Sequence, residues 1–399
     1  MFEETAPLSF SITATIKSIP EQDWKRLFGE ELIEGYGYHK TLEESGMARF
    51  SFRYLLAKRS GVIVAVIPFF LMGFSFTTLI RGPLQELIFF IRKIFSNFLL
   101  VKVAFAGCPT TEKFYLGVSS QENLAAVMDG ALKTLYEFCR KEKMQALLFY
   151  NLTAREMPLA DYLKRKGFAL MENLPSTVVE IKEGSLEGYI KNLGKSTRKN
   201  IRRALRSQSS SGLETEVQDD TKEITEEIYK LYLNTLSASD INFEVLTKSF
   251  FRNICLNMPG VAKYLITRDP QGKIIAFNLC LVKEDVCIDK FVGFDPEAQK
   301  KYRLYYTTFC HNIAWCIKNK IRFYCPGQAD YDPKIRLGAK LLPLHIYFKP
   351  LNPAIGLLKG LIATLAAPGN FDPALRNLKK YKRRDLNTSR LADKQIQDF

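Results

Sequence analysis

The sequence lacks the residue spacings that metal and disulfide sites require. Its cysteines form no Cys-x-x-Cys pair; they stand at positions 108, 139, 255, 280, 287, 310, 316 and 325. Six of them lie inside apolar strand or helix patterns, which is typical of reduced, buried thiols in a cytosolic protein. We therefore expect packing roles for the cysteines, with no metal site and no disulfide framework.

Signatures of covalent catalysis are also missing. The chain has no Gly-x-Ser-x-Gly sequence. Cys310 and His311 are adjacent in a predicted helix, where consecutive side chains diverge, so they are not expected to form a nucleophile pair. His39 and His345 stand alone in the sequence. Packing or surface roles are therefore expected for all three histidines.

No secretory signal is expected, because the first seven residues contain two glutamates and no basic residue. The uncharged run Val62–Ile80 is long enough to span a bilayer. Pro68 and Gly73 interrupt it, and β-branched residues dominate its start, so we interpret it as buried strands. The run begins a predicted hairpin with Arg49–Lys58. An integral membrane protein is the alternative interpretation.

Positive charge is what the chain has in excess. Its 399 residues carry a formal net charge of +15, which favours an anionic partner such as nucleic acid, a membrane surface or a phosphorylated substrate. Leu186–Arg206, predicted as one helix, has no acidic residue after Gly188, and Arg376–Arg384 has none at all. The length accommodates two domains with sizeable cores.

The stretch Val261–Phe323 indicates the fold class. Three apolar runs, separated by turns at Asp269–Gly272 and Lys283–Asp285, predict an antiparallel meander. The apolar period changes to three and four residues over Gln299–Lys318, which predicts one long helix before a short strand. This order places a strand end beside a helix N-terminus, where N–H groups and the helix dipole favour phosphate.

A similar order of elements occurs in the first half of the chain. Its clearest helix is Ser119–Lys143, with Ser119 or Ser120 as the cap, and residues 84–98 also have helical spacing. We therefore expect an α/β protein with similar domains at residues 1–180 and 181–350, each a mixed, mainly antiparallel sheet flanked by helices. Residues 351–399 add an apolar helix, for packing or for an interface, and a basic tail. The tail suits a solubilising or nucleic-acid-like extension or contact with anionic lipid.

Three polar stretches accompany the second domain. Asn192–Ala204 is rich in Lys and Arg, and Val292–Glu297 leaves the meander. Gly327-Gln328 and Lys334–Ala339 lie in a polar loop before the predicted strand Leu341–Phe348. In this order the stretches resemble the Fem-like transferases, the peptidoglycan biosynthesis/recognition group, whose fold is the acyl-CoA N-acyltransferase (GNAT) fold in tandem.

The resemblance covers roughly residues 10–350. It implies a transferase that moves an acyl or aminoacyl group from a thioester or ester donor to an amine or hydroxyl of a cell-envelope or lipid-linked acceptor. The family's pyrophosphate loop has glutamine or arginine and then two glycines before a helix, whereas this chain has Tyr302 and Leu304 at the glycine positions. Cationic side chains would replace backbone N–H groups there. Acyl-CoA and aminoacyl-tRNA both remain candidate donors.

The expected site residues fall into three groups. Asp289, in the third strand of the meander, is the preferred general base because burial would raise its pKa, and Asp330 and Tyr331 are second choices. An ion pair with Lys290 or exposure to water is the alternative role for Asp289. The residues expected to bind donor phosphates are Lys195, Arg198, Lys199, Arg202, Gln299, Lys300, Lys301 and Arg303. The expected substrate loop contributes Gln328, Lys334 and Arg336.

A second class of function stays open. A non-catalytic module on the same fold would bind RNA or anionic lipid through its basic faces, with strong salt dependence and no acyl transfer. For the transferase we expect a cytoplasmic protein in peripheral contact with the anionic inner face of the membrane. The sequence leaves its oligomeric state open.

Overall fold

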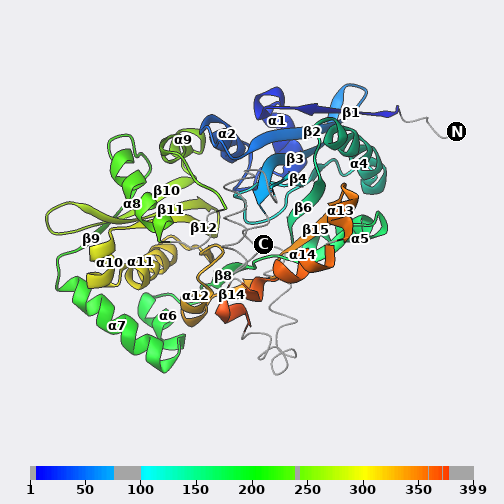
Figure 1. The fold of residues 1–399 in the computed structure, drawn as a ribbon. Coiled ribbons are helices and arrows are strands. Elements are labelled where there is room, and N and C mark those ends of the chain that lie inside the picture. The colour runs from blue at the N-terminus through cyan, green and yellow to red at the C-terminus, as the bar shows by residue number, and fades with distance from the viewer. Residues whose placement is uncertain (1–5, 76–99, 239–242, 358, 371, 377–399) are drawn as a thin grey trace, which may run out of the picture. The chain divides into compact units, whose positions relative to one another are not determined.

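The computed structural model describes residues 6–75, 100–238, 243–357, 359–370 and 372–376 (Figure 1). The predicted helix at residues 84–98 and nearly all of the basic tail lie outside the described residues. The chain forms two compact units. Unit 1 comprises the described parts of residues 1–30, 48–175 and 343–399, and unit 2 comprises those of residues 31–47 and 176–342.

Unit 1 is built on an eight-stranded sheet with the order β1-β2-β3-β4-β6-β15-β7, and β5 pairs with β3. Its strands are β1 (Leu8–Thr13), β2 (Ser51–Arg59), β3 (Val62–Ser75), β4 (Leu100–Ala106), β5 (Gly117–Val118), β6 (Ala146–Leu152), β7 (Ala169–Glu172) and β15 (His345–Pro350). Only β4 and β6 pair in parallel. The helices of this unit are α1 (Glu21–Phe28), α4 (Leu124–Lys141), α5 (Met157–Arg165), α13 (Pro353–Leu357) and α14 (Lys359–Leu365).

The uncharged run that begins at Val62 is a strand over its described part. β3 pairs with β2 and β4, and most of its side chains are buried, so the hairpin interpretation is confirmed there. Residues 76–80 of the run lie outside the described residues. No helix within the described part of the chain is both long and apolar enough to cross a bilayer.

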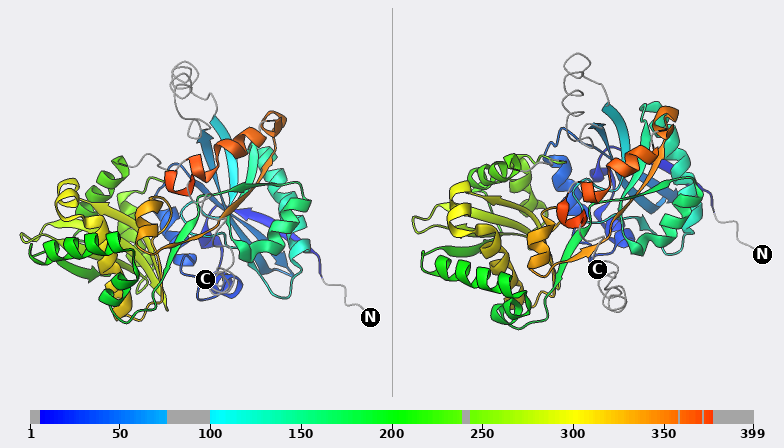
Figure 2. Two further views of the ribbon diagram at one scale, coloured as in Figure 1. Left: turned by 90° about the horizontal axis from the view of Figure 1, so that it is seen from below. Right: turned by 60° about the horizontal axis from the view of Figure 1, so that its bottom comes forward.

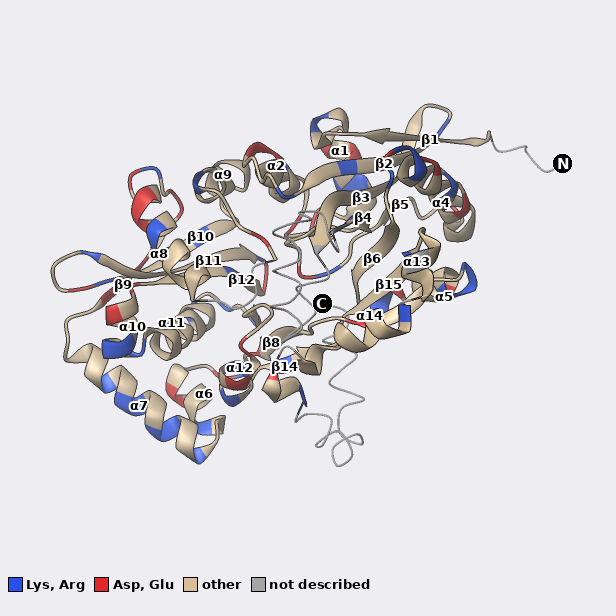
Figure 3. Cartoon of the chain, in the orientation of Figure 1, with Lys and Arg blue, Asp and Glu red and all other residues tan. Residues whose placement is uncertain are grey.

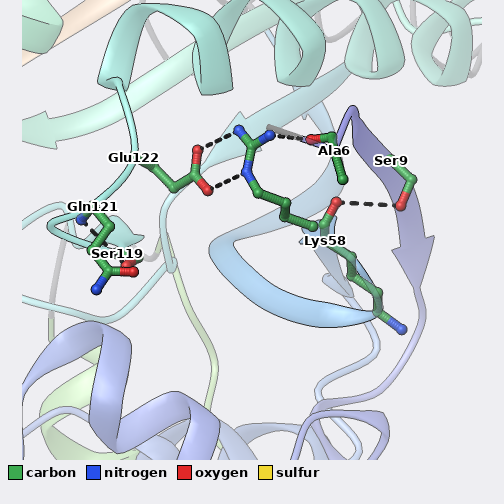
Figure 4. A network of polar contacts seen from close by, with 7 residues as sticks. Ala6, Ser9, Lys58, Ser119, Gln121 and Glu122 are labelled. Atoms are coloured by element: carbon green, nitrogen blue, oxygen red, sulfur yellow. Dashed lines mark hydrogen bonds and ion pairs between the residues drawn. The ribbon is translucent and has the colours of Figure 1, made fainter. Parts of the chain in front are cut away.

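The start of α4 differs from the sequence prediction. Asn123 Oδ1 accepts the N–H of Ala126 at 3.1 Å, so the cap is Asn123 and not Ser119 or Ser120. The segment before it is held by an ion pair, in which Glu122 accepts Arg59 Nε at 2.7 Å and Nη2 at 2.8 Å (Figure 4). The remaining terminal nitrogen of Arg59 donates to the Ala6 carbonyl. These contacts fix the segment before α4 on β2.

Unit 2 is built on a seven-stranded sheet with the order β14-β8-β13-β12-β11-β10-β9. Its strands are β8 (Ser176–Glu180), β9 (Glu214–Gln218), β10 (Ala262–Arg268), β11 (Ile274–Lys283), β12 (Val286–Phe294), β13 (Phe323–Cys325) and β14 (Lys340–Leu342). Its helices are α2 (Tyr36–Glu44), α6 (Leu186–Asn192), α7 (Lys195–Ser209), α8 (Thr225–Ser237), α9 (Lys248–Asn257), α10 (Pro296–Tyr302), α11 (Leu304–Lys318) and α12 (Tyr331–Arg336). The meander β10-β11-β12 is confirmed, and β12 pairs in parallel with β13.

Helices flank both faces of this sheet (Figures 1 and 2). On one face α6, α7 and α11 share a core with the sheet through buried side chains such as Ile190, Ile201 and Ile313. On the other face Phe250 of α9 packs edge-to-face on Phe291 of β12, with ring centroids 5.6 Å apart. All eight cysteines are free and buried, as predicted.

Three elements predicted as continuous are interrupted. Leu186–Arg206 divides into α6 and α7 at Leu193, whose extended backbone turns its side chain into the core. Gln299–Lys318 divides at Arg303, which adopts a left-handed conformation with φ 54° between α10 and α11. Leu341–Phe348 divides into β14 and β15, which belong to different sheets.

The units also differ from the predicted contiguous domains 1–180 and 181–350. Residues 31–47 belong to unit 2, where Thr247 Oγ1 donates to the Ser45 carbonyl at 2.6 Å. β15 belongs to unit 1, between β6 and β7. Unit 2 therefore gains a helix, and the sheet of unit 1 gains a strand, from segments distant in sequence.

Candidate functional site

The sheet of unit 2 opens where β12 separates from β13. The parallel pairing of these strands ends at Ile288 and Cys325, while β12 continues along β11 to Phe294. Asp289 is the first β12 residue beyond the pairing. The β11–β12 register shifts here, so that Lys290 is an extra residue in a β-bulge. A bulge beside a strand opening re-aims the neighbouring side chains, which is common at functional sites.

Asp289 lies at the centre of a buried hydrogen-bonded cluster. Its Oδ2 accepts from Tyr324 Oη at 2.5 Å, from Asn278 Nδ2 at 2.8 Å and from Asn312 Nδ2 at 3.2 Å. Asn312 Nδ2 is also 3.0 Å from Tyr324 Oη. Asp289 is only 6% exposed to solvent, and its second oxygen, Oδ1, is buried without a hydrogen-bond partner. A buried carboxylate oxygen without a hydrogen-bond partner destabilises the fold, and such atoms are rare in native proteins outside functional positions.

Burial raises the pKa of Asp289 to about 6, and hydrogen bonds from Tyr324 and Asn278 and the charge of Lys334 limit the rise. A carboxyl group with this pKa is mostly ionised at neutral pH, yet it is a stronger base than an exposed aspartate. Lys290, the alternative partner considered for Asp289, forms a buried ion pair with Glu34 at 2.8 Å. The geometry and the pKa both suit a general base.

The polar loop before α12 lies near this carboxylate. Lys334 is buried, and its Nζ donates to the carbonyls of Gln328 at 2.8 Å and Gly327 at 3.3 Å. Asp330 is exposed and has a left-handed backbone with φ 48°. Tyr331 is fully buried. Lys334 thus fixes the loop and affects the charge of Asp289, while only Asp330 of the second-choice residues reaches solvent.

A pocket of about 450 Å³ lies between α7, the α10–α11 junction and α12. Its lining contains no acidic residue and comprises Ser196, Thr197, Asn200, Ile201, Ala204, Gln299, Lys300, Arg303, Tyr306 and Arg336. Four predicted residues therefore come together here: Gln299, Lys300, Arg303 and Arg336. The other predicted binding residues do not line it: Lys195, Arg198, Lys199, Arg202, Lys301, Gln328 and Lys334. The excess of cations favours an anionic occupant.

Side chains, rather than free backbone groups, supply the polar surface at the start of α11. Gln299 Oε1 accepts the N–H of Tyr305 at 2.9 Å, so this first-turn donor is already used within the chain. Arg303 takes the left-handed conformation that a glycine adopts without strain. Lys300, Arg303 and Arg336 therefore remain as the pocket's groups for phosphate or carboxylate. Arg336 Nε also forms an exposed ion pair with Asp332 at 2.9 Å, which leaves its terminal nitrogens for an anion.

Two tyrosines of α11 pack against each other beside the pocket. The ring of Tyr306, which lines the pocket, packs edge-to-face on Tyr305 with centroids 5.7 Å apart. Burial raises the pKa of Tyr305, and the charges of Asp330 and Asp289 raise it further. The sequence pattern did not indicate a site role for either tyrosine, nor for Asn278, Asn312 and Tyr324. The polar residues inside apolar strand and helix patterns were the available signal.

The cations of α7 divide between two roles (Figure 3). Arg198 Nη1 donates to the Lys191 carbonyl at 2.7 Å, and Arg202 Nη2 forms an ion pair with Glu187 at 2.5 Å, so both hold α7 to α6. Lys195 and Lys199 are exposed. Two of the four α7 residues predicted to bind the donor thus contact α6, and the other two face solvent.

Comparison with known proteins gives a family match and a set of similar folds. Residues 15–343 match the FemAB-like family model, described as peptidoglycan biosynthesis/recognition. No curated protein sequence matches the chain. Among solved structures, FemX has a TM-score of 0.54 and 12% identity, with 88% of this chain and 99% of that chain covered.

Two further structures extend this likeness. A tandem GNAT protein of the clavulanic acid biosynthesis pathway has a TM-score of 0.52 and 10% identity, covering 86% of this chain and 98% of that chain. The C-terminal domain of a protein assigned as a lysylphosphatidylglycerol synthetase from Agrobacterium fabrum has a TM-score of 0.51 and 15% identity, covering 87% and 98%. These likenesses confirm the predicted tandem GNAT fold.

Proposed function

The chain belongs to the FemAB-like family of peptidoglycan biosynthesis/recognition, and from this membership we propose that it transfers an aminoacyl group from aminoacyl-tRNA to an amine of a cell-envelope or lipid-linked acceptor. The buried carboxylate of Asp289, with a pKa of about 6 at the opening of the unit-2 sheet, is the observation that carries the proposal. The family supplies the class of reaction, and the site supplies a base for it.

In the proposed reaction, the acceptor amine attacks the ester carbonyl of the donor. A C–N bond forms, the ester C–O bond breaks, and the ribose hydroxyl leaves. Asp289 accepts the proton that the amine loses, and the leaving hydroxyl oxygen is protonated in turn, so that one proton passes from amine to ribose. Tyr324 and Asn278 hold the carboxylate by their hydrogen bonds, which leaves Oδ1 as the oxygen available to a proton.

Two observations support an RNA-linked ester over acyl-CoA as donor. Tyr302 and Leu304 replace the glycines that a pyrophosphate loop uses, and the Tyr305 N–H is already bonded to Gln299. A pyrophosphate would thus find less free backbone at this helix start than glycines would offer. The pocket instead presents Lys300, Arg303 and Arg336, which can bind one phosphate or carboxylate through side chains.

A donor panel tests the function. Purified protein is incubated with an amine acceptor and with acetyl-CoA, a longer acyl-CoA or a mixture of aminoacyl-tRNAs, and amide formation is followed by mass spectrometry. We expect product only with aminoacyl-tRNA. Product with acyl-CoA alone would replace the proposed donor. Binding of RNA or lipid without product from any donor would instead favour the non-catalytic module.

A lipid-linked acceptor would lie at the membrane, and unit 1 has a candidate surface for peripheral contact with it. Leu357 and Leu361 of α13 and α14 are 89% and 55% exposed, and the basic stretch Arg376–Arg384 follows them in sequence. Exposed leucines that are followed in sequence by several cations favour an anionic bilayer surface. The name of the lysylphosphatidylglycerol synthetase similarly refers to a lipid product of that protein.

We expect the double variant Leu357→Glu/Leu361→Glu to lose most binding to phosphatidylglycerol vesicles. Full transfer of two leucine side chains from water into the bilayer contributes roughly 3–6 kcal/mol to binding. Co-sedimentation measures the bound fraction. The matched control is Leu256→Glu, a substitution at a leucine of unit 2 that is 69% exposed. Equal loss in both variants would remove the assignment of this surface.

A further inference from the structure

One row of cations on α7 has no role in the contacts that hold unit 2 together. It consists of Lys195, Lys199, Arg203 and Arg206, all exposed. Within the described part of the chain none of the four forms an ion pair, whereas Arg202 beside them is paired with Glu187. Unpaired like charges on one helix repel each other, so an ordinary solvated helix intersperses them with acids. This row therefore suits an anionic partner.

The row borders the candidate donor pocket. Each residue of an α-helix turns by about 100°, which places the row's four side chains within an arc of about 80°. Around the helix axis, the next positions beside this arc are those of Ser196 and Asn200, which line the pocket. The row extends about 16 Å along the helix from Lys195 to Arg206, since each residue rises by about 1.5 Å. A chain of phosphates could thus leave the pocket and continue along the row.

The face of α7 that carries the row fits a polyanion in water better than a bilayer. A helix that lies on a membrane turns its apolar side chains towards the lipid. In α7 the apolar side chains Ile201 and Ala204 are buried in unit 2 instead. The described residues of α7 include no exposed large hydrophobic side chain. A bilayer could therefore interact with this face only through the charges of its Lys and Arg side chains.

We propose that the α7 cation row binds the phosphate backbone of the donor's RNA, with the aminoacylated end at the pocket. This inference rests on the proposed function, because it assigns a surface to the same donor. Cations that contact phosphates release counterions, so their contribution to affinity is recognised by its dependence on salt. Arg198 and Arg202 contact α6 and do not belong to the row.

Binding of deacylated tRNA tests the row directly. The variant Lys195→Gln/Lys199→Gln/Arg203→Gln/Arg206→Gln removes four charges from unit 2. The control variant is Lys133→Gln/Arg140→Gln/Lys141→Gln/Lys143→Gln. It removes four exposed charges from α4 and the turn that follows it in unit 1. We expect the row variant alone to bind at least 10-fold more weakly at 50 mM salt. The slope of log Kd against log salt should also fall by about 3, as expected for the loss of four phosphate contacts.

Two outcomes would overturn the proposal. The first is equal loss of tRNA affinity in the two variants. The second is a row variant that keeps its tRNA affinity but loses binding to phosphatidylglycerol vesicles, which would assign the row to lipid. If the row variant does not unfold cooperatively, the single variants Lys195→Gln and Arg203→Gln replace it, and unchanged tRNA affinity in both then overturns the proposal.

Turnover separates this inference from the proposed function. A short aminoacylated RNA that contains only the acceptor end reaches the pocket without the rest of the backbone. We expect the row variant to have reduced kcat/KM with full-length aminoacyl-tRNA and near-normal kcat/KM with the short donor. If the row variant turns over both donors at the rate of the unchanged protein, the proposed RNA-binding role of the row is refuted and the proposed function is not. Lack of turnover by the unchanged protein would refute the function, and the tRNA-binding result would still decide the row.

Discussion

Asp289→Asn is expected to slow aminoacyl transfer severely and, at the same time, to make the protein more stable at neutral pH. The asparagine cannot accept the amine's proton, and loss of a general base costs roughly 10²- to 10⁴-fold in rate. The stabilisation follows from burial, which raises the pKa of this carboxyl from 3.8 to about 6. A shift of that size corresponds to roughly 3 kcal/mol of folding free energy at neutral pH.

The sign of the pH dependence follows from the same shift. A folded-state pKa above the unfolded value means that folding favours the neutral acid. The cost of the ionised carboxylate is absent below about pH 4, develops between pH 4 and 6 and is complete above this window. Since asparagine does not titrate, the stability advantage of the variant should grow with pH across the window. The kcat/KM of the unchanged protein should rise with pH through about 6, because the base must be ionised.

Denaturant unfolding at pH 4 and pH 8, together with the pH profile of kcat/KM, measures both effects. Asp330→Asn is the matched variant, because Asp330 is exposed and was the second-choice base. It should change the free energy of unfolding by less than about 0.5 kcal/mol. An active Asp289→Asn enzyme with an inactive Asp330→Asn enzyme would transfer the catalytic role to the loop.

Neutralising the pocket is expected to raise the donor KM by roughly 10²- to 10³-fold, with a smaller change in kcat. The variant is Lys300→Gln/Arg303→Gln/Arg336→Gln, which removes the three cations that line the pocket. At a site open to water each charge-assisted contact with phosphate contributes on the order of 1 kcal/mol, so the loss of all three, about 3–4 kcal/mol, mainly weakens donor binding. Steady-state kinetics with aminoacyl-tRNA, at fixed salt, separates KM from kcat.

Lys301→Gln is the control for the pocket variant. Lys301 is next to Lys300 in sequence but does not line the pocket, and its Nζ lies 4.7 Å from the ring centroid of Tyr302. We expect this control to leave KM within about 3-fold of the unchanged protein, because it removes only a distant charge. A similar rise of KM in both variants would show that overall charge, and not the pocket, governs donor binding.

Local patterns in the sequence predicted much of the fold. Alternation and turn residues identified the meander, and the interrupted run after Val62 was recognised as strand over its described part. The resemblance to Fem-like proteins and the tandem GNAT fold were confirmed. Asp289 is the preferred base because burial within a strand raises the pKa of its carboxyl. The strand and base inferences needed only neighbouring residues, and the resemblance needed the order of stretches along the chain.

The sequence by itself determined the α/β class, the basic surface and the carboxylate buried in the third meander strand, because period and composition are local properties. Tertiary structure alone decided which groups meet. Asn278, Asn312 and Tyr324 reach one oxygen of Asp289 from β11, α11 and β13, and no local pattern specifies that convergence. The backbone break at Arg303 and the division of α7 into pocket, α6-facing and exposed sides likewise depend on burial by distant segments.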